Sequence, residues 1–235
     1  MPTQSGDVLN GTDIYRERPP PLRWRHVVEC FWEQKVVTAR VQRVIPDGFA
    51  DLLVDNDGCL TTVGMHDQVD LPVLLPGTHI HGVRLRPEVV GRAFRTPAWE
   101  IANASVRLDD VLGNERARQF ADRSHRVEWL DSLLPSQRTA AAVELLAHRP
   151  VGEVANQLGI STRHLRRIML DEVGLGPGRY QRVARFRRFV GALDRRESTA
   201  SAAALAGYAD QPHATRETRR LAGITPRELV SERHT

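Results

Sequence analysis

Two stretches decide the fold: GISTRHLRRIMLDEVGLGPGRYQRVARFRR at 159–188 and AGYADQPHATRETRRLAGITPREL at 206–229. Each starts at the end of a short apolar helix, turns at a glycine, and continues into an arginine-bearing helix. A second glycine ends that helix, and a proline opens the next. Glycine tolerates the left-handed backbone of a helix end, and proline is tolerated in a first turn because no N–H is needed there. This internal repeat predicts two similar helical units.

The residues around the two glycine turns strengthen this interpretation. VGEVANQL at 151–158 has apolar residues at i, i+3, i+4 and i+7, which predicts an amphipathic helix of about two turns. Ser161 is then a natural N-cap for a helix at 162–173, and Asp210 for a helix at 211–222. A long basic helix after Pro177 joins the two units. The pattern of short helix, turn and second helix with outward arginines is that of a helix-turn-helix.

The charge is concentrated where these helices are expected. Residues 140–235 contain 16 arginines and 10 acidic residues, a net charge of +6, whereas residues 1–139 carry −2. This split indicates that only the C-terminal part meets a polyanion. Lys35 is the only lysine, and guanidinium groups can pair bidentately with phosphate or guanine. No apolar run approaches the ~20 residues that span a bilayer, and the N-terminus lacks signal-peptide features, so we expect a cytoplasmic protein without a membrane partner.

A recognition helix must pack one face on the protein and present donors on the other, because the major groove is about 12 Å wide. In the first unit Leu165, Ile168 and Met169 are expected to face inward, and in the second Ala214 and Leu221. The expected DNA-contacting residues of the two recognition helices are Thr162, Arg163, Arg166, Arg167, Gln211, His213, Arg216 and Arg220. On the joining helix we expect Arg185 and Arg188 to contact phosphates.

These motifs, over roughly residues 140–232, resemble the AraC/XylS family of bacterial transcription regulators. The resemblance implies two helix-turn-helix subdomains that place two recognition helices in adjacent major-groove segments. It carries over, as base-facing candidates, Arg163, Arg166, Arg167, Gln211, His213 and Arg216. The sequence departs from the family where the second recognition helix usually has aromatic core residues, because Ala214 and Thr218 stand there. We therefore expect the second unit to be the looser one.

The N-terminal half has a different pattern. Residues 22–85 contain short apolar or alternating runs, VVECFW, RVIPDGFADLLV, CLTTVG and GVRLRP, separated by turn signals, which is typical of strands. Residues 1–21 are expected to be an extended lead, residues 88–95 and 97–104 to be short helices, and residues 113–138 to be a helix followed by a linker with its boundary near Pro135. The sequence thus predicts an α+β protein with a β-rich domain at 1–135 and an all-α domain at 136–235.

This half resembles the uncharacterised domain that accompanies many AraC-type regulators. The resemblance rests on Trp32, the Pro46-Asp47-Gly48 turn, Asp51 and the segment at 84–87. It implies effector sensing, dimerisation or both. Arg84 and Arg86 alternate on an expected strand, so they are candidates for an anionic ligand, with surface ion pairs as the alternative.

Other possible sites are weaker. His79 and His81 place two rings on one side of a strand, and with His66 or Cys59 they would form a metal site. No third ligand stands at a motif spacing, so we expect no metal and no cofactor. Cys30 and Cys59 lack the surroundings of an activated thiolate. We expect no catalytic residues.

The sequence therefore predicts a sequence-specific transcription regulator with a sensory N-terminal half. Its expected partner is double-stranded DNA, with RNA polymerase, a small-molecule effector and a second copy of the chain as candidate partners. One alternative is a small-ligand or metal-dependent barrel enzyme with a DNA-targeting C-terminal domain. The other is a non-specific architectural protein.

Overall fold

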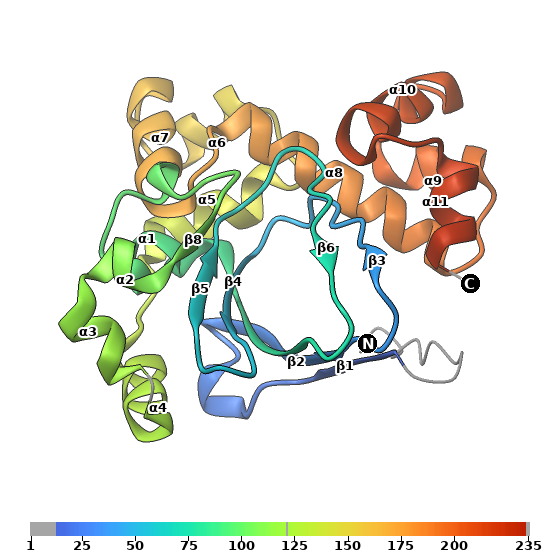
Figure 1. Cartoon of the computed structure of the whole chain (residues 1–235). Coiled ribbons are helices and arrows are strands. Elements are labelled where there is room, and N and C mark those ends of the chain that lie inside the picture. The colour runs from blue at the N-terminus through green and yellow to red at the C-terminus, as the bar shows by residue number, and fades with distance from the viewer. Residues whose placement is uncertain (1–12, 121, 234–235) are drawn as a thin grey trace.

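The computed structural model describes residues 13–120 and 122–233 (Figure 1). It has a β-rich N-terminal half and a helical C-terminal half, which confirms the predicted α+β class. The expected lead lies partly outside the described residues.

An antiparallel sheet of six strands organises the N-terminal half. Its order is β1 (Ile14–Arg18), β2 (Val28–Lys35), β7 (His79–Leu85), β4 (Ala50–Val54), β5 (Leu60–Val63) and β8 (Ser105–Arg107). A ribbon of β3 (Arg40–Val41) and β6 (Val73–Leu74) stands opposite this sheet (Figure 1). Close packing fixes one strand position, since a Cβ on Gly82 would lie 2.0 Å from Cε2 of the Trp32 ring on β2. Only glycine fits there.

The first strand corrects the sequence analysis. Residues 14–18 were expected to belong to an extended lead, but they pair along β2 from Ile14 opposite Lys35 to Arg18 opposite Phe31. The IYRER segment has two apolar residues, so its own pattern gives little strand signal. Its conformation comes from pairing with the edge of a strand that is distant in sequence.

Short helices cover one face of the sheet. They are η1 (Leu22–Trp24), η2 (Pro87–Val89), α1 (Val90–Phe94), η3 (Ala98–Glu100), α2 (Leu108–Leu112), α3 (Asn114–Gln119) and α4 (Arg123–Ser132). The core between them and the sheet includes Val28, Leu52, Leu85, Phe94 and Leu108. The helix expected at 88–95 is present as η2 and α1, the helix expected at 97–104 is reduced to η3, and the segment at 113–138 holds two helices, α3 and α4.

The C-terminal half consists of helices around one long central helix. They are α5 (Gln137–Leu146), α6 (Val151–Gln157), α7 (Thr162–Ile168), the π-helical η4 (Met169–Val173), α8 (Pro177–Asp194), α9 (Thr199–Ala206), α10 (Gln211–Ala222) and α11 (Pro226–Arg233). In Figure 1, α5, α6 and α7 surround the start of α8, and α9, α10 and α11 surround its end. The predicted domain boundary at residue 135 falls between α4 and α5.

The two halves contact each other closely. Met65 lies in the core of the first helix-turn-helix unit, and Ile45 packs against the core of the second. A Cβ on Gly91 in α1 would lie 2.4 Å from the carbonyl oxygen of Asp171 in η4. The N-terminal half thus packs directly against the segment that continues the first recognition helix.

Candidate nucleic-acid interface

The first recognition helix is α7. Ser161 caps it as predicted, since its Oγ accepts a hydrogen bond from the backbone N–H of His164 at 3.2 Å. Leu165 and Met169 are fully buried, and Ile168 is partly buried, so the predicted inward face is present. The predicted DNA-contacting residues of α7 all have exposed side chains: Thr162, Arg163, Arg166 and Arg167.

The second recognition helix, α10, has the same arrangement. Asp210 caps it through a 2.6 Å hydrogen bond from the N–H of His213 to its Oδ1. Ala214, Thr218 and Leu221 are fully buried. The exposed candidates are Gln211, Arg216 and Arg220. His213 is partly buried, because its ring packs edge-on against Tyr208 at a centroid distance of 5.2 Å.

The two arginines predicted to contact phosphates from α8 also have contacts inside the protein. Arg188 donates to the carbonyl oxygen of Ala147, just after α5, and at 3.1 Å to that of Ala206, at the end of α9. Burial, reinforced by repulsion from neighbouring arginines, lowers the pKa of Arg188. The guanidinium of Arg185 lies 5.7 Å from the ring centroid of Tyr208, within the range of a cation–π contact. Their phosphate contacts stay a prediction.

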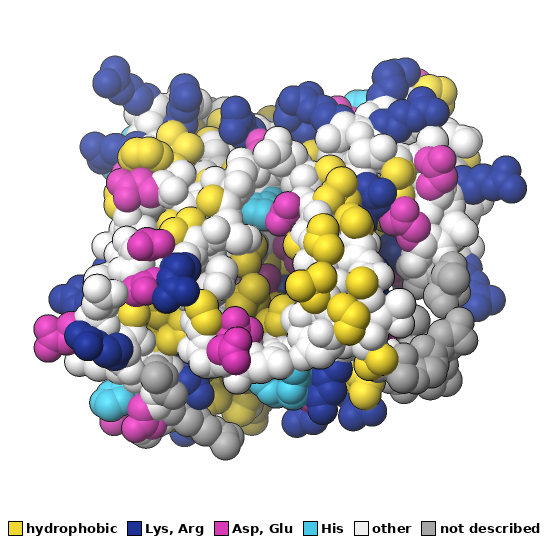
Figure 2. Space-filling model, in the orientation of Figure 1, with side chains coloured by type: hydrophobic (Ala, Val, Ile, Leu, Met, Phe, Trp, Pro, Cys, Tyr) yellow, Lys and Arg dark blue, Asp and Glu magenta, His cyan; other side chains and the backbone are white. Residues whose placement is uncertain are grey.

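The two recognition helices lie along one edge of the molecule (Figure 1). Helices α7 and α10 lie on the same side of the long helix α8, near its two ends (Figure 1). Figure 2 shows Lys and Arg side chains along this edge, over both helix-turn-helix units. We call this surface the basic edge and define it by Arg163, Arg166, Arg167, Arg216 and Arg220.

Sequence reasoning missed one residue beside this edge. Trp99 of η3, in the N-terminal half, is 52% exposed, and it lines a shallow hollow together with Arg163, Arg166 and Arg167. Trp99 lies beside α7 because the preceding residue, Ala98, packs closely against Gly174, where a Cβ would lie 3.0 Å from the carbonyl oxygen of Ala98. The sequence places Trp99 in a short helix but gives no sign of its exposure or of its neighbours.

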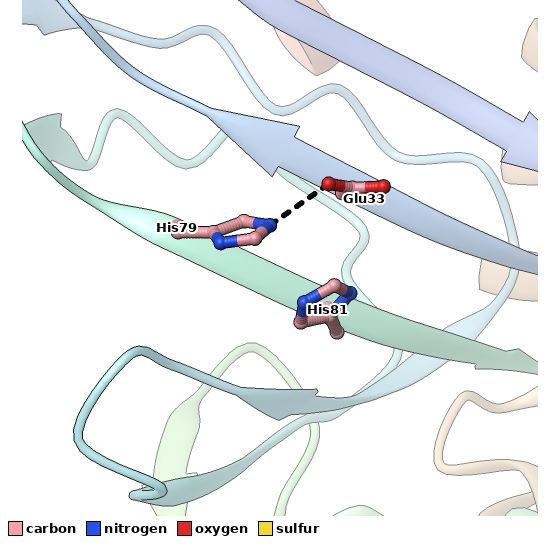
Figure 3. Close-up of side chains that lie close together, drawn as sticks. All are labelled: Glu33, His79 and His81. Carbon is pink, nitrogen blue, oxygen red and sulfur yellow. Dashed lines mark hydrogen bonds and ion pairs between the residues drawn. The ribbon is translucent and has the colours of Figure 1, made fainter.

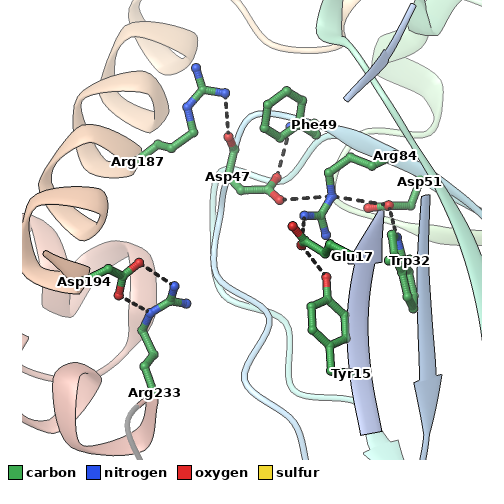
Figure 4. Close-up of polar contacts among 10 residues, drawn as sticks. All are labelled: Tyr15, Glu17, Trp32, Asp47, Phe49, Asp51, Arg84, Arg187, Asp194 and Arg233. Carbon is green, nitrogen blue, oxygen red and sulfur yellow. Dashed lines mark hydrogen bonds and ion pairs between the residues drawn. The ribbon is translucent and has the colours of Figure 1, made fainter. Parts of the chain in front are cut away.

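The predicted ligand-binding residue Arg84 lies in a cluster of ion pairs (Figure 4). Its guanidinium lies 3.2 Å from Glu17, 3.6 Å from Asp47 and 3.4 Å from Asp51. Trp32 donates a 2.7 Å hydrogen bond to the same Asp51 carboxylate. Burial raises the pKa of Asp51 to about 6, although the charge of Arg84 opposes the shift.

Arg86 has different partners, because it pairs with Glu29 at 3.5 Å and with Glu88 at 3.0 Å. The two arginines therefore do not act as a pair in the described structure. An anionic ligand of Arg84 would have to displace a carboxylate that already neutralises it. The assignment of both arginines to ligand binding stays a prediction.

The same cluster reaches the DNA-binding half. The turn that carries Asp47 contacts α8, since Arg187 donates to the Asp47 carbonyl oxygen at 3.3 Å and its guanidinium lies 4.8 Å from the Phe49 ring (Figure 4). Further along, Arg43 donates at 2.7 Å to the carbonyl oxygen of Ala222, the last residue of α10. Arg43 also pairs with Glu232 at 2.8 Å.

The predicted histidine pair is also close in space. The rings of His79 and His81 have centroids 4.4 Å apart. Their neighbour is Glu33 rather than His66 or Cys59, the partners considered from the sequence. Burial raises the pKa of Cys30 to about 12, so its thiol stays protonated at neutral pH, as expected for an unreactive cysteine.

Two capped, arginine-bearing helices, each preceded by a short helix and exposed on one side, define a DNA-binding protein with two helix-turn-helix units. The comparison with protein families agrees. Residues 154–232 match a helix-turn-helix domain, and residues 16–107 match a domain of unknown function, DUF6597. The C-terminal half thus carries an AraC-type helix-turn-helix domain, which supports a DNA-binding transcription regulator, as the sequence resemblance implied. The helix-turn-helix match supports DNA binding, and neither match supports the alternative of a barrel enzyme.

Solved structures similar to the chain include several of ToxT from Vibrio cholerae. A ligand-free ToxT variant shares 10% identity at a TM-score of 0.45, over 94% of this chain and 98% of that one. ToxT bound to (E)-4-(8-methylnaphthalen-1-yl)but-3-enoic acid shares 9% identity at a TM-score of 0.46, over 93% of this chain and 99% of that one. A search of curated proteins found no match. Among the described helices, none combines the length and the apolar character that crossing a bilayer requires.

Proposed function

We propose that the chain binds duplex DNA by placing α7 and α10 in two successive major-groove segments on one face of the duplex. The observation that carries this proposal is the position of both helices on one side of α8, near its two ends (Figure 1). Helix α8 has 18 residues, so it is about 27 Å long. Successive major-groove segments on one face of B-DNA are about 34 Å apart. A joining helix of this length suits two units that contact groove segments one duplex turn apart.

The side chains of the basic edge have distinct proposed roles. Arg163, Arg166 and Arg167 read guanine from α7, since a guanidinium can donate two hydrogen bonds to one guanine edge. Gln211 suits adenine, and Arg216 suits guanine, with Thr162, His213 and Arg220 at flanking contacts. Arg185 and Arg188 remain candidates for phosphates. Trp99 adds an apolar surface beside α7 that fits a thymine methyl group or a sugar.

In this proposal the N-terminal half regulates the orientation of the two units. It touches the first unit through Gly91 and Met65, and the second through Arg43 and Ile45. A small-molecule effector or a second copy of the chain that shifts these contacts would change how well α7 and α10 fit the duplex together. The regulator acts in the cytoplasm, with RNA polymerase as a partner at the promoter, and the proposed function includes no catalytic step.

Selection of bound fragments from random duplex DNA by the full-length protein tests this function. We expect the selected sites to share two short elements about 10–10.5 bp apart, centre to centre. Binding should also weaken steeply with salt, because each phosphate contact releases about one counterion. Arg118→Ala on α3 serves as the control, because it removes an exposed arginine outside the basic edge. Equal affinity for unrelated sequences would instead support an architectural protein.

A further inference from the structure

Three potential metal ligands meet on the sheet of the N-terminal half. His79 and His81 are two residues apart on β7, so their side chains point to the same face. Glu33 on β2 is the direct cross-strand partner of His81. One ligand atom from each of the three residues lies within 4.8 Å of the other two (Figure 3). We infer that this cluster binds a divalent transition-metal ion, with zinc as the best fit.

The chemistry of the three side chains selects the metal. Two imidazoles and one carboxylate are a ligand set that zinc accepts, with water as the fourth ligand. Hard cations such as Mg²⁺ and Ca²⁺ prefer ligand sets made of oxygen atoms, so a cluster with two imidazole nitrogens favours a transition metal. His81 is exposed, which leaves a side open for the ion and for the water.

The backbone holds the ligands in place before any ion binds. β7 is paired on both sides, with β2 along His79–Leu85 and with β4 as far as His81. The N–H of His79 donates a 2.6 Å hydrogen bond to the side-chain oxygen of Asn56. The imidazole Nε2 of His79 lies 2.9 Å from Oε1 of Glu33. The strands already fix all three Cα atoms, so binding has to order only the side chains.

One neighbour opposes the ion. The ammonium of Lys35 lies 3.3 Å from Oε1 of Glu33 and competes with a cation for that oxygen. The Lys35 side chain is 46% exposed, so it can turn into solvent when the ion enters. This competition gives a sharp test, because removing Lys35 should strengthen metal binding while removing a ligand should weaken it.

The experiment is calorimetric titration of zinc chloride into the full-length protein without a histidine tag. We expect the unaltered chain to bind one zinc ion. The variants His81→Ala, His79→Ala and Glu33→Gln should each lose this binding or bind zinc at least tenfold more weakly. Lys35→Ala should bind it more tightly than the unaltered chain. His125→Ala, which removes an exposed histidine of α4, is the matched control and should leave the titration unchanged.

Cobalt provides a second readout. Four-coordinate Co²⁺ at this site should give visible absorption that is lost in His81→Ala and kept in His125→Ala. Because His81 is exposed, its replacement should not unfold the chain, and an unchanged circular dichroism spectrum would establish this. Absence of zinc binding to the unaltered protein would overturn the inference, as would zinc binding that survives His81→Ala or Glu33→Gln at full affinity.

Discussion

The two helix-turn-helix units have the same outline but place their large side chains differently. In the first unit the recognition helix and its π-helical extension bring Leu165, Met169 and Val173 into the core. In the second, α10 contributes Leu221 with the small Ala214 and Thr218, and α8 adds the large rings of Phe186 and Phe189. A helix-turn-helix can therefore keep its shape when smaller side chains on its recognition helix are accompanied by larger ones on the helix that supports it.

The units also differ in how the N-terminal half holds them. The first is held by close backbone packing at Gly91 and by the buried Met65. The second is held in part by a charged side chain, Arg43, which reaches the end of α10 and Glu232. Apolar close packing is insensitive to salt, whereas a partly exposed ion pair is screened. The contact of Arg43 with the second unit is thus one that salt should weaken.

The largest expected effect on stability tests the contribution of α8 to the core of the second helix-turn-helix unit. Phe189→Ala removes a fully buried ring that packs edge-on against Tyr208 at 5.6 Å, and should cost about 3–5 kcal/mol of unfolding free energy. Amide exchange should show lost protection in α9 and α10 while α7 stays protected. Leu165→Ala in the first unit should give the reverse pattern. Even loss across both units in either variant would contradict the division of the core.

A second prediction tests the backbone packing that holds the first unit. Gly91→Ala forces a Cβ to within 2.4 Å of the Asp171 carbonyl oxygen, so it should destabilise the chain by about 1–3 kcal/mol. Gly152→Ala on α6 is the matched control, because nothing lies within 4 Å of its Cβ. It should instead stabilise slightly, since alanine has fewer unfolded conformations to lose. Urea denaturation of the two variants measures both effects, and equal midpoints would be the contrary result.

Two substitutions on the basic edge compare how the two units contribute to base recognition. Arg167→Ala and Arg216→Ala should each cost about 1–3 kcal/mol of binding and relax base preference at different positions, one helical turn apart. Arg185→Ala should weaken binding evenly across sequences. Selection experiments with each variant give the answer, and the role assignments would be wrong if all three relaxed the same position.

The smallest expected effect concerns the charged contact on the second unit. Arg43→Ala should cost no more than about 1 kcal/mol, because both partners of the Arg43–Glu232 pair are partly exposed. The loss should appear as faster amide exchange at the end of α10 in low salt and fade in high salt. A loss of the same size in both salt conditions would mean that Arg43 acts through packing rather than charge.

Local signals in the sequence predicted the C-terminal half well. Ser161 and Asp210 were identified as caps because a cap depends only on residues within one turn of it. The loose second unit was expected from Ala214 and Thr218 alone, and that reason is weakened because Phe186 and Phe189 fill the same core from α8. Periodicity shows which side chains face inward, but it does not show which helix supplies the volume opposite them.

Contacts between distant segments are what the sequence could not provide. Trp99 and Arg43 reach the recognition helices only through the packing of the two halves. Glu33 joins His79 and His81 only through the register of β2 on β7, so no motif spacing reveals it. The helix expected at 162–173 changes to a π-helix at Met169, a change that the apolar pattern did not indicate.

The contacts of Arg188 with both units have a consequence for the target DNA. By bonding to the ends of α5 and α9, this side chain ties both short helices to α8 and limits rotation of one unit against the other. Two weak binders on a rigid spacer gain a high effective concentration only when the spacer matches the distance between their sites. One extra base pair between the two elements turns the second by about 34° and moves it about 3.4 Å. The affinity of this protein should therefore depend on the length between its two half-elements as sharply as on their sequence.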